Sequence, residues 1–175
     1  MYFSFRKATL LDTEKIVDLV NSAYRGESSK KGWTTEADLL GGQRTDSREI
    51  QEFVQTPNSQ MILCESKSNE LLGCVLLKKN GHRCYFGMFA VKPTTQGQGL
   101  GKSFIAYSEE FARKELDCNQ MYMTVITLRE ELIAWYERRG YKRTGEIEKF
   151  PYGNERAGIP RRDNIELEVL VKELR

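Results

Sequence analysis

One stretch of the sequence decides the fold, and it reads Phe89-Ala90-Val91-Lys92-Pro93-Thr94-Thr95-Gln96-Gly97-Gln98-Gly99-Leu100-Gly101-Lys102. An apolar strand end is followed by a turn with three glycines, and the turn leads into a helix whose apolar side chains recur at helical spacing. Glycines let backbone N–H groups approach a ligand closely, and a helix N-terminus adds unpaired donors and a partial positive charge. The stretch therefore predicts a binding site for a phosphate or pyrophosphate.

Two common phosphate-binding motifs do not fit the spacing of these glycines. A Walker A loop ends in Gly-Lys-Ser, as residues 101–103 do, but its first glycine would fall on Gln96. A dinucleotide fingerprint needs G-x-G-x-x-G, and its third glycine would fall on Lys102 or Phe104. A nucleotide hydrolase built on residues 101–103 remains a rival interpretation, as does a plain strand–turn–helix packed through small residues.

The rest of the chain alternates strands and helices around this turn. Asn80-Gly81 is a strong signal for a tight hairpin, so the strands beside it belong to an antiparallel meander. Apolar patterns predict strands at residues 2–7, 60–66, 71–78, 83–91, 121–126, 141–147 and 165–172. Helical spacing predicts helices that follow an N-cap at Asp12 and end at Tyr24, and that span residues 47–55, 100–111 and 129–139. Hairpins combined with β-α-β crossovers indicate an α/β fold, a mixed sheet with helices on its faces.

Length, composition and charge limit the class of protein. At roughly 150 residues per domain, a chain of 175 residues predicts a single domain over residues 1–175. With 39% hydrophobic and 30% charged residues, the chain is neither disordered nor of low complexity. A net charge of +2 argues against a nucleic-acid binder, and no apolar run approaches the ~20 residues of a membrane span. The chain does not begin like a secretory signal, so we expect a cytoplasmic protein.

The rare residues exclude several kinds of catalytic site. The single histidine, His82, follows the hairpin turn, so neither a zinc site built from several histidines nor a Ser-His-Asp triad fits. The cysteines form no C-x-x-C pair. We therefore expect no metal and no disulfide, and buried free thiols at Cys64, Cys74, Cys84 and Cys118.

The glycine turn resembles the Q/R-x-x-G-x-G/A motif of the GNAT acetyltransferase superfamily, which binds acetyl-CoA, with Gln96, Gly99 and Gly101 in the fixed positions. The later Tyr136-Glu137-Arg138-Arg139-Gly140-Tyr141 is similar to the family's Y-x-x-x-G-[FY] signature. The order of elements agrees over nearly the whole chain. The resemblance implies a GNAT-like, mostly antiparallel sheet of about seven strands with helices on both faces.

The resemblance also implies how acetyl-CoA would bind as a co-substrate. In the family the strand before the turn is splayed from its neighbour, and the pantetheine arm pairs with its backbone, here at Phe89, Ala90 and Val91. The pyrophosphate then meets the turn and the helix start, which implies contacts at Gln96, Gly97, Gln98, Gly99, Leu100, Gly101 and Lys102. Arg129 stands where many relatives have asparagine, and Leu132 where many have alanine, so a side-chain contact from position 129 is in doubt.

For the chemistry, the resemblance implies that Tyr136 is the general acid that protonates the departing thiolate. A tyrosine with a pKa of about 10 keeps its proton at neutral pH, although a purely packing role is the alternative. A backbone N–H near Ala90 would polarise the thioester carbonyl. Some relatives use a glutamate as the base where this chain has Tyr85, so we expect deprotonation through water.

The acceptor is expected to enter from the side opposite the cofactor. The resemblance places the loop after the first helix there, with Trp33, Glu36, Asp38 and Arg44. An aromatic ring beside carboxylates suits a cationic amine, and an ordinary solvated loop is the alternative. A second loop before the last strand could close over the acceptor, with one of the two arginines at 161–162 holding a substrate carboxylate.

The resulting hypothesis is an acetyl-CoA-dependent N-acetyltransferase. It would move an acetyl group by direct transfer to a primary amine of a small molecule or peptide. The alternative is a non-catalytic acyl-CoA-binding sensor of the same fold. We expect a monomer or homodimer that binds neither nucleic acid nor membranes.

Overall fold

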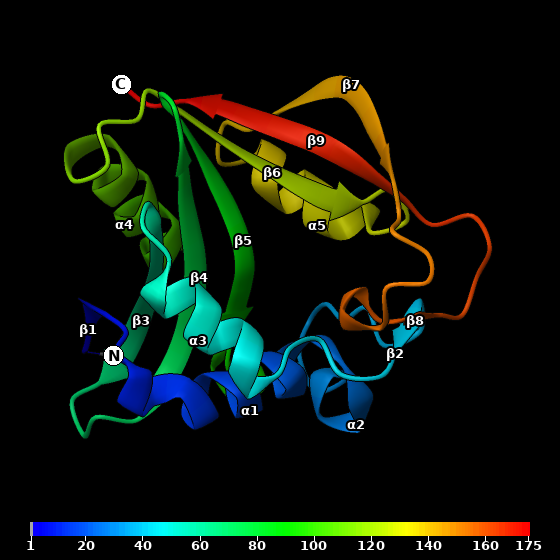
Figure 1. Cartoon of the computed structure of the whole chain (residues 1–175), viewed down its shortest axis with the longest axis horizontal. Helices are drawn as coiled ribbons and strands as arrows, with labels where there is room; N and C mark the ends of the chain where they lie inside the picture. The colour runs from blue at the N-terminus through cyan, green and yellow to red at the C-terminus, as the bar shows by residue number, and fades with distance from the viewer. Residues whose placement is uncertain (1) are drawn as a thin grey trace.

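A sheet of seven strands forms the centre of the protein in the computed structural model, which describes residues 2–175 (Figure 1). In spatial order the strands are β1 (Phe3–Lys7), β3 (Ser59–Ser66), β4 (Leu71–Asn80), β5 (Arg83–Val91), β6 (Gln120–Ile126), β9 (Glu166–Glu173) and β7 (Lys142–Lys149). Neighbouring strands are antiparallel except β5 and β6, which are parallel. The predicted mostly antiparallel α/β sheet and its central meander are confirmed.

Helices cover both faces of this sheet, as predicted. They are α1 (Thr13–Tyr24), α2 (Gly26–Ser29), α3 (Ser47–Gln55), α4 (Leu100–Lys114) and α5 (Glu130–Glu137), with 3-10 turns at Leu10–Asp12, Pro93–Thr95 and Glu155–Ala157. Asp46 caps α3 by accepting a hydrogen bond from the backbone N–H of Glu49 at 2.8 Å. Asp12 occupies the N-cap position of α1 but makes no bond to the start of that helix, because its carboxylate pairs with Arg6 at 2.7 Å and accepts from the backbone N–H of Thr9 at 2.8 Å.

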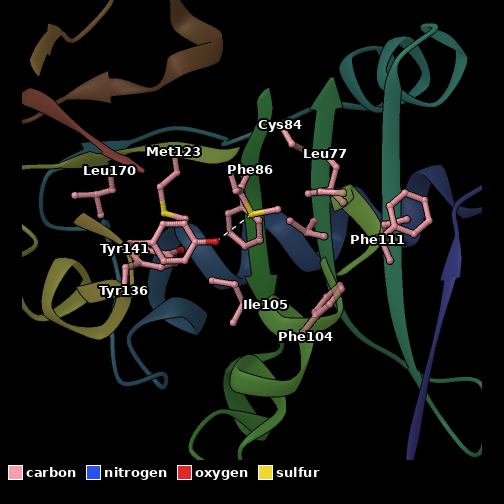
Figure 2. Packing of buried hydrophobic residues seen from close by; sticks show 14 of the residues in the cluster. Leu77, Cys84, Phe86, Phe104, Ile105, Phe111, Met123, Tyr136, Tyr141 and Leu170 are labelled. Carbon is pink, nitrogen blue, oxygen red and sulfur yellow. Dashed lines mark hydrogen bonds between the residues drawn. The ribbon is translucent and has the colours of Figure 1, made fainter. Parts of the chain in front are cut away.

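The continuous apolar run in β4 follows from burial on both sides. Val75 and Leu77 pack into the cluster beneath α4 and α5, whereas Cys74 and Leu76 pack into the cluster beneath α1 and α3. Figure 2 shows the first of these clusters, in which aromatic rings from α4, α5 and the sheet gather. The labelled side chains include Leu77, Phe86, Phe104, Phe111, Met123, Tyr136 and Tyr141.

The sheet opens at its middle. Strands β5 and β6 pair only over residues 83–85 and 120–122, and beyond that point they diverge, so that the two halves of the sheet form a V in Figure 1. Strand β9 lies between β6 and β7 and completes the second half. The splay implied by the family resemblance is therefore present, and it leaves the second half of β5 without a strand partner on that side.

A two-stranded ribbon joins two loops that the sequence patterns leave separate. Strand β2 (Leu40–Gly41) pairs with β8 (Ile159–Pro160), and the ribbon lies below the open end of the V (Figure 1). The side chain of Arg25 strengthens this junction by donating hydrogen bonds to the carbonyls of Gly41 and Ala157, each at 3.0 Å. The loop before the last strand thus meets the loop after the first helix.

The expectations for the hairpin turn and for the cysteines are also confirmed. Asn80 pairs with Arg83 across a two-residue turn that exposes His82. All four cysteines are free and buried, and burial raises the pKa of the Cys64, Cys74 and Cys84 thiols to about 12. Among residues 2–175, no helix has both the length and the apolar character needed to cross a bilayer.

Candidate active site

A cavity of about 390 Å³ lies beside the end of β5 that has no partner in β6. It is bounded by the end of β5, the glycine turn, the start of α4, and side chains of α5. Its lining, which lies entirely within the described residues, contains three cationic side chains, Lys102, Arg129 and Arg139, and no carboxylate. A pocket with this charge favours an anionic ligand.

The glycine turn presents its backbone to this cavity. Gly97 and Gly99 both have φ of +81°, a conformation that costs other residues energy, and a Cβ on either would meet nothing within 4 Å. Helix α4 begins directly after Gly99, so its free N–H groups face the same space. Gln98 is exposed and the Leu100 side chain is buried in the core, and neither lines the cavity. Leu100 can therefore contact a ligand only through its backbone.

Gln96 holds the turn against a neighbouring loop. Its Nε2 donates to the carbonyl of Val91 at 3.0 Å, and its Oε1 accepts from the backbone N–H of Trp33 at 3.0 Å. Gly32 lies so close that a Cβ there would sit 2.4 Å from that Oε1. The side chain of Gln96 is thus occupied with structural bonds and shapes the rim of the cavity.

A second cavity of about 430 Å³ lies between β5 and β6, where the two strands diverge. The two cavities share five lining residues, Tyr24, Phe89, Arg129, Leu132 and Tyr136, and these mark the place where the cavities meet. Ligands in the two cavities would therefore approach each other at this junction.

Tyr136 stands at the junction on the buried face of α5. Only 6% of the residue is exposed, and its ring makes edge contacts with Trp135 and Tyr141 at centroid distances of 5.1 and 5.7 Å. Within residues 2–175 its hydroxyl has no hydrogen-bond partner. Burial raises the pKa of Tyr136 well above its ordinary value, so the phenol keeps its proton at neutral pH.

A bulge in β5 shapes the wall opposite Tyr136. Between the pairs Cys74–Ala90 and Leu76–Gly87, β5 has one residue more than β4, and Met88 takes a φ of +48°. The hydroxyl of Tyr24 donates to the Phe89 carbonyl at 3.0 Å and so holds the bulge from α1. Tyr24 has no motif around it, and the helical spacing of α1 marked it only as a core residue.

Buried ion pairs line the second cavity. Glu36 accepts from Nε of Arg25 at 2.8 Å, and a second oxygen lies 3.6 Å from the guanidinium of Arg129. Arg129 also donates to the hydroxyl of Thr34 at 2.8 Å. These bonds tie the loop after α1 to the start of α5. Position 129, where the sequence departs from many relatives, is therefore tied to that loop through Thr34 and Glu36.

The structure separates the four residues expected on the acceptor side. Glu36 and Arg44 line the second cavity, whereas Trp33 lines the first, 6.5 Å from the ring of Trp135. Asp38 is exposed and lines neither cavity. The arginines at 161–162 are likewise outside both linings.

The comparisons with known proteins agree on one family and one fold. The model of the acetyltransferase (GNAT) family matches residues 16–141. A variant of spermidine N-acetyltransferase from Vibrio cholerae superposes with a TM-score of 0.71 at 14% identity, over 98% of this chain and 94% of that one. The ribosomal-protein-S18-alanine N-acetyltransferase of Escherichia coli gives 0.72 at 12% identity, over 99% and 94%. Nourseothricin acetyltransferase gives 0.70 at 17% identity, over 100% of both chains. No curated protein matches the chain significantly.

Proposed function

Because this chain belongs to the acetyltransferase (GNAT) family, we propose that it transfers an acetyl group from acetyl-CoA directly to a primary amine of a small molecule or peptide. Membership of the family makes the chain an acyltransferase. The observation that carries the proposal is the position of Tyr136, a protonated phenol at the junction of one cavity suited to an anionic ligand and a second cavity.

The first cavity fits the acyl donor. Its lining combines cationic side chains with free backbone N–H groups at the turn, which suits a diphosphate. The part of β5 beyond Tyr85 has no partner in β6 and can pair with the amides of a pantetheine arm. The residues proposed to hold the donor are Phe89, Ala90, Val91, Gln96, Gly97, Gln98, Gly99, Leu100, Gly101 and Lys102. In this proposal Gln96 acts by supporting the turn.

The chemistry proposed for the junction needs few side chains. The neutral amine forms a bond to the thioester carbon, the carbon–sulfur bond breaks, and the amine loses a proton to water. Tyr136 gives its proton to the departing sulfur and regains one from solvent. A backbone N–H near Ala90 stabilises the negative charge on the carbonyl oxygen. The proton leaves through water in this proposal, because Tyr85 lines the second cavity where some relatives have a glutamate base.

The test is a panel of primary amines mixed with acetyl-CoA, with release of free CoA as the readout. We expect CoA release with some amines, and calorimetry should show CoA binding with no tight binding of ATP. Tight CoA binding with no release across the whole panel would favour the sensor. Tight ATP binding without CoA binding would overturn the proposal in favour of a nucleotide hydrolase.

A further inference from the structure

The side chains around the second cavity carry an excess of positive charge. Four arginines line it, at positions 25, 44, 129 and 156, against two carboxylates, Glu36 and Glu49, and one of the arginines, Arg156, pairs at 3.8 Å with Glu52 outside the lining. An uncompensated positive charge in a concave, partly enclosed space attracts anions. The amine acceptor is expected in this cavity, so the charge of its lining bears on what else the acceptor carries.

Glu36 is not available to a cationic acceptor. Arg25 and Arg129 both approach its carboxylate, at 2.7 and 3.6 Å, and all three side chains are at most 10% exposed. The Nε of Arg129 is moreover buried without a hydrogen-bond partner among residues 2–175. Around Glu36 there are therefore more donors than acceptors, the opposite of what an ammonium group requires.

Arg44 is the arginine of this cavity that makes no direct ion pair among residues 2–175, although the carboxylates of Glu36 and Glu49 lie near enough to act on its charge. Within the described residues its guanidinium makes no hydrogen bond or ion pair, and it lies over the ring of Tyr24 at 5.5 Å. Its backbone is fixed, because Asn21 Oδ1 accepts from the N–H of Arg44 at 2.7 Å. The remaining carboxylate, Glu49, accepts from the hydroxyl of Thr45 at 2.6 Å.

The position of Arg44 connects this charge to the reacting centre. The ring beneath it belongs to Tyr24, whose hydroxyl reaches the Phe89 carbonyl at the junction of the two cavities. A single small molecule can therefore place an amine at the junction and an anionic group at Arg44, along one face of one tyrosine.

We propose that the acceptor is a primary amine that also carries a carboxylate or another oxyanion, and that Arg44 binds this group. The proposal deepens the proposed acetyl transfer and rests on it. A guanidinium offers two parallel N–H donors that match the two oxygens of a carboxylate or phosphonate. The expected acceptor is thus of the amino-acid type, and a polyamine without an oxyanion is expected to be poor.

The experiment compares each common L-amino acid with its carboxamide, its decarboxylated amine and, where obtainable, its aminophosphonate. We expect kcat/KM for the acids to exceed that for the amides by about tenfold or more, as one charged hydrogen-bonded pair implies. Arg44→Gln should remove this preference, mainly through a higher KM for the acid, and Arg44→Lys should restore part of it. Arg48→Gln, an exposed arginine on α3, is the matched control that should keep the preference. The aminophosphonates show which oxyanion is preferred.

Equal kcat/KM for acids and amides, or a preference that survives in Arg44→Gln, overturns the inference and leaves the proposed acetyl transfer intact. If CoA binds but no amine is acetylated, the transfer proposal fails, and calorimetry of the same pairs on the CoA-bound protein decides the inference separately. Binding of an acid over its amide that disappears in Arg44→Gln supports it. Absence of any such difference in binding overturns it.

Discussion

Tyr136 and Tyr141 lie five residues apart, and loss of the hydroxyl should lower activity at the first and stability at the second. Tyr136→Phe keeps the ring contacts and removes no hydrogen bond, so its free energy of unfolding should change little. If Tyr136 is the general acid, kcat should fall by about 10²- to 10⁴-fold. Tyr141→Phe removes bonds from its hydroxyl to Glu109 and to the sulfur of Met121, each 3.0 Å long (Figure 2 draws the second), so it should cost about 1.5–3 kcal/mol of stability.

The assay combines steady-state kinetics on the best amine of the panel with urea unfolding of both variants. We expect Tyr136→Phe to lower kcat with KM for acetyl-CoA almost unchanged, and Tyr141→Phe to lower the urea midpoint with kcat unchanged. A Tyr136→Phe variant that retains a third or more of kcat would refute the assignment. So would equal losses of activity in both variants, because these would indicate a shared packing effect.

The pH profile gives an independent check on the same tyrosine. Burial raises the pKa of Tyr136 above its ordinary value of 10, so the acid form persists through the neutral and mildly alkaline range. The alkaline decline of kcat should therefore begin above pH 10. A decline with a midpoint near pH 8 would contradict Tyr136 as the proton donor.

Three further predictions concern two ion pairs and the glycine turn. Arg25→Met leaves Glu36 without its nearer ion-pair partner, so the free energy of unfolding should fall by about 3 kcal/mol, as urea unfolding would show. An unchanged urea midpoint would argue against a stabilising role for this buried pair. The pKa of Asp12 is lowered to about 2, chiefly by its hydrogen bond to Arg6. The Asp12 carboxylate should therefore stabilise the fold above its unfolded pKa, and this stabilisation should be lost as the pH falls from about 4 to 2. Because Arg6 is 40% exposed, Asp12→Asn should cost only about 1 kcal/mol at pH 7 and flatten this pH dependence, as unfolding between pH 5 and 2 would show. Gly99→Ala meets no steric obstacle but forces alanine to φ +81°, so it should cost about 1 kcal/mol and weaken CoA binding in calorimetry, whereas unchanged binding would separate the turn from the ligand.

Most of the fold was predictable because it depends on spacing along the chain. The meander, the hairpin at Asn80-Gly81 and the helix after the glycine turn all follow from patterns within ten or fifteen residues. The ribbon of β2 and β8 was not predictable, because each strand is two residues long, has no periodicity, and pairs with a segment more than a hundred positions away. Asp12 illustrates the same limit, since Arg6 on β1 takes the carboxylate that local spacing assigns to a helix cap.

For the candidate site, local spacing was enough to locate the glycine turn beside the first cavity and the tyrosine of α5, because both belong to motifs whose residues are neighbours in the chain. The charge that an acceptor would meet in the second cavity could not be predicted from local spacing. Trp33, Glu36 and Asp38 suggested a cationic amine, yet the folded chain neutralises Glu36 with Arg25 and Arg129 and leaves Arg44 without a direct ion pair in the described part of the chain. Compensation of a charge depends on which distant side chains come within a few ångströms of it, and only the folded arrangement of loops decides that.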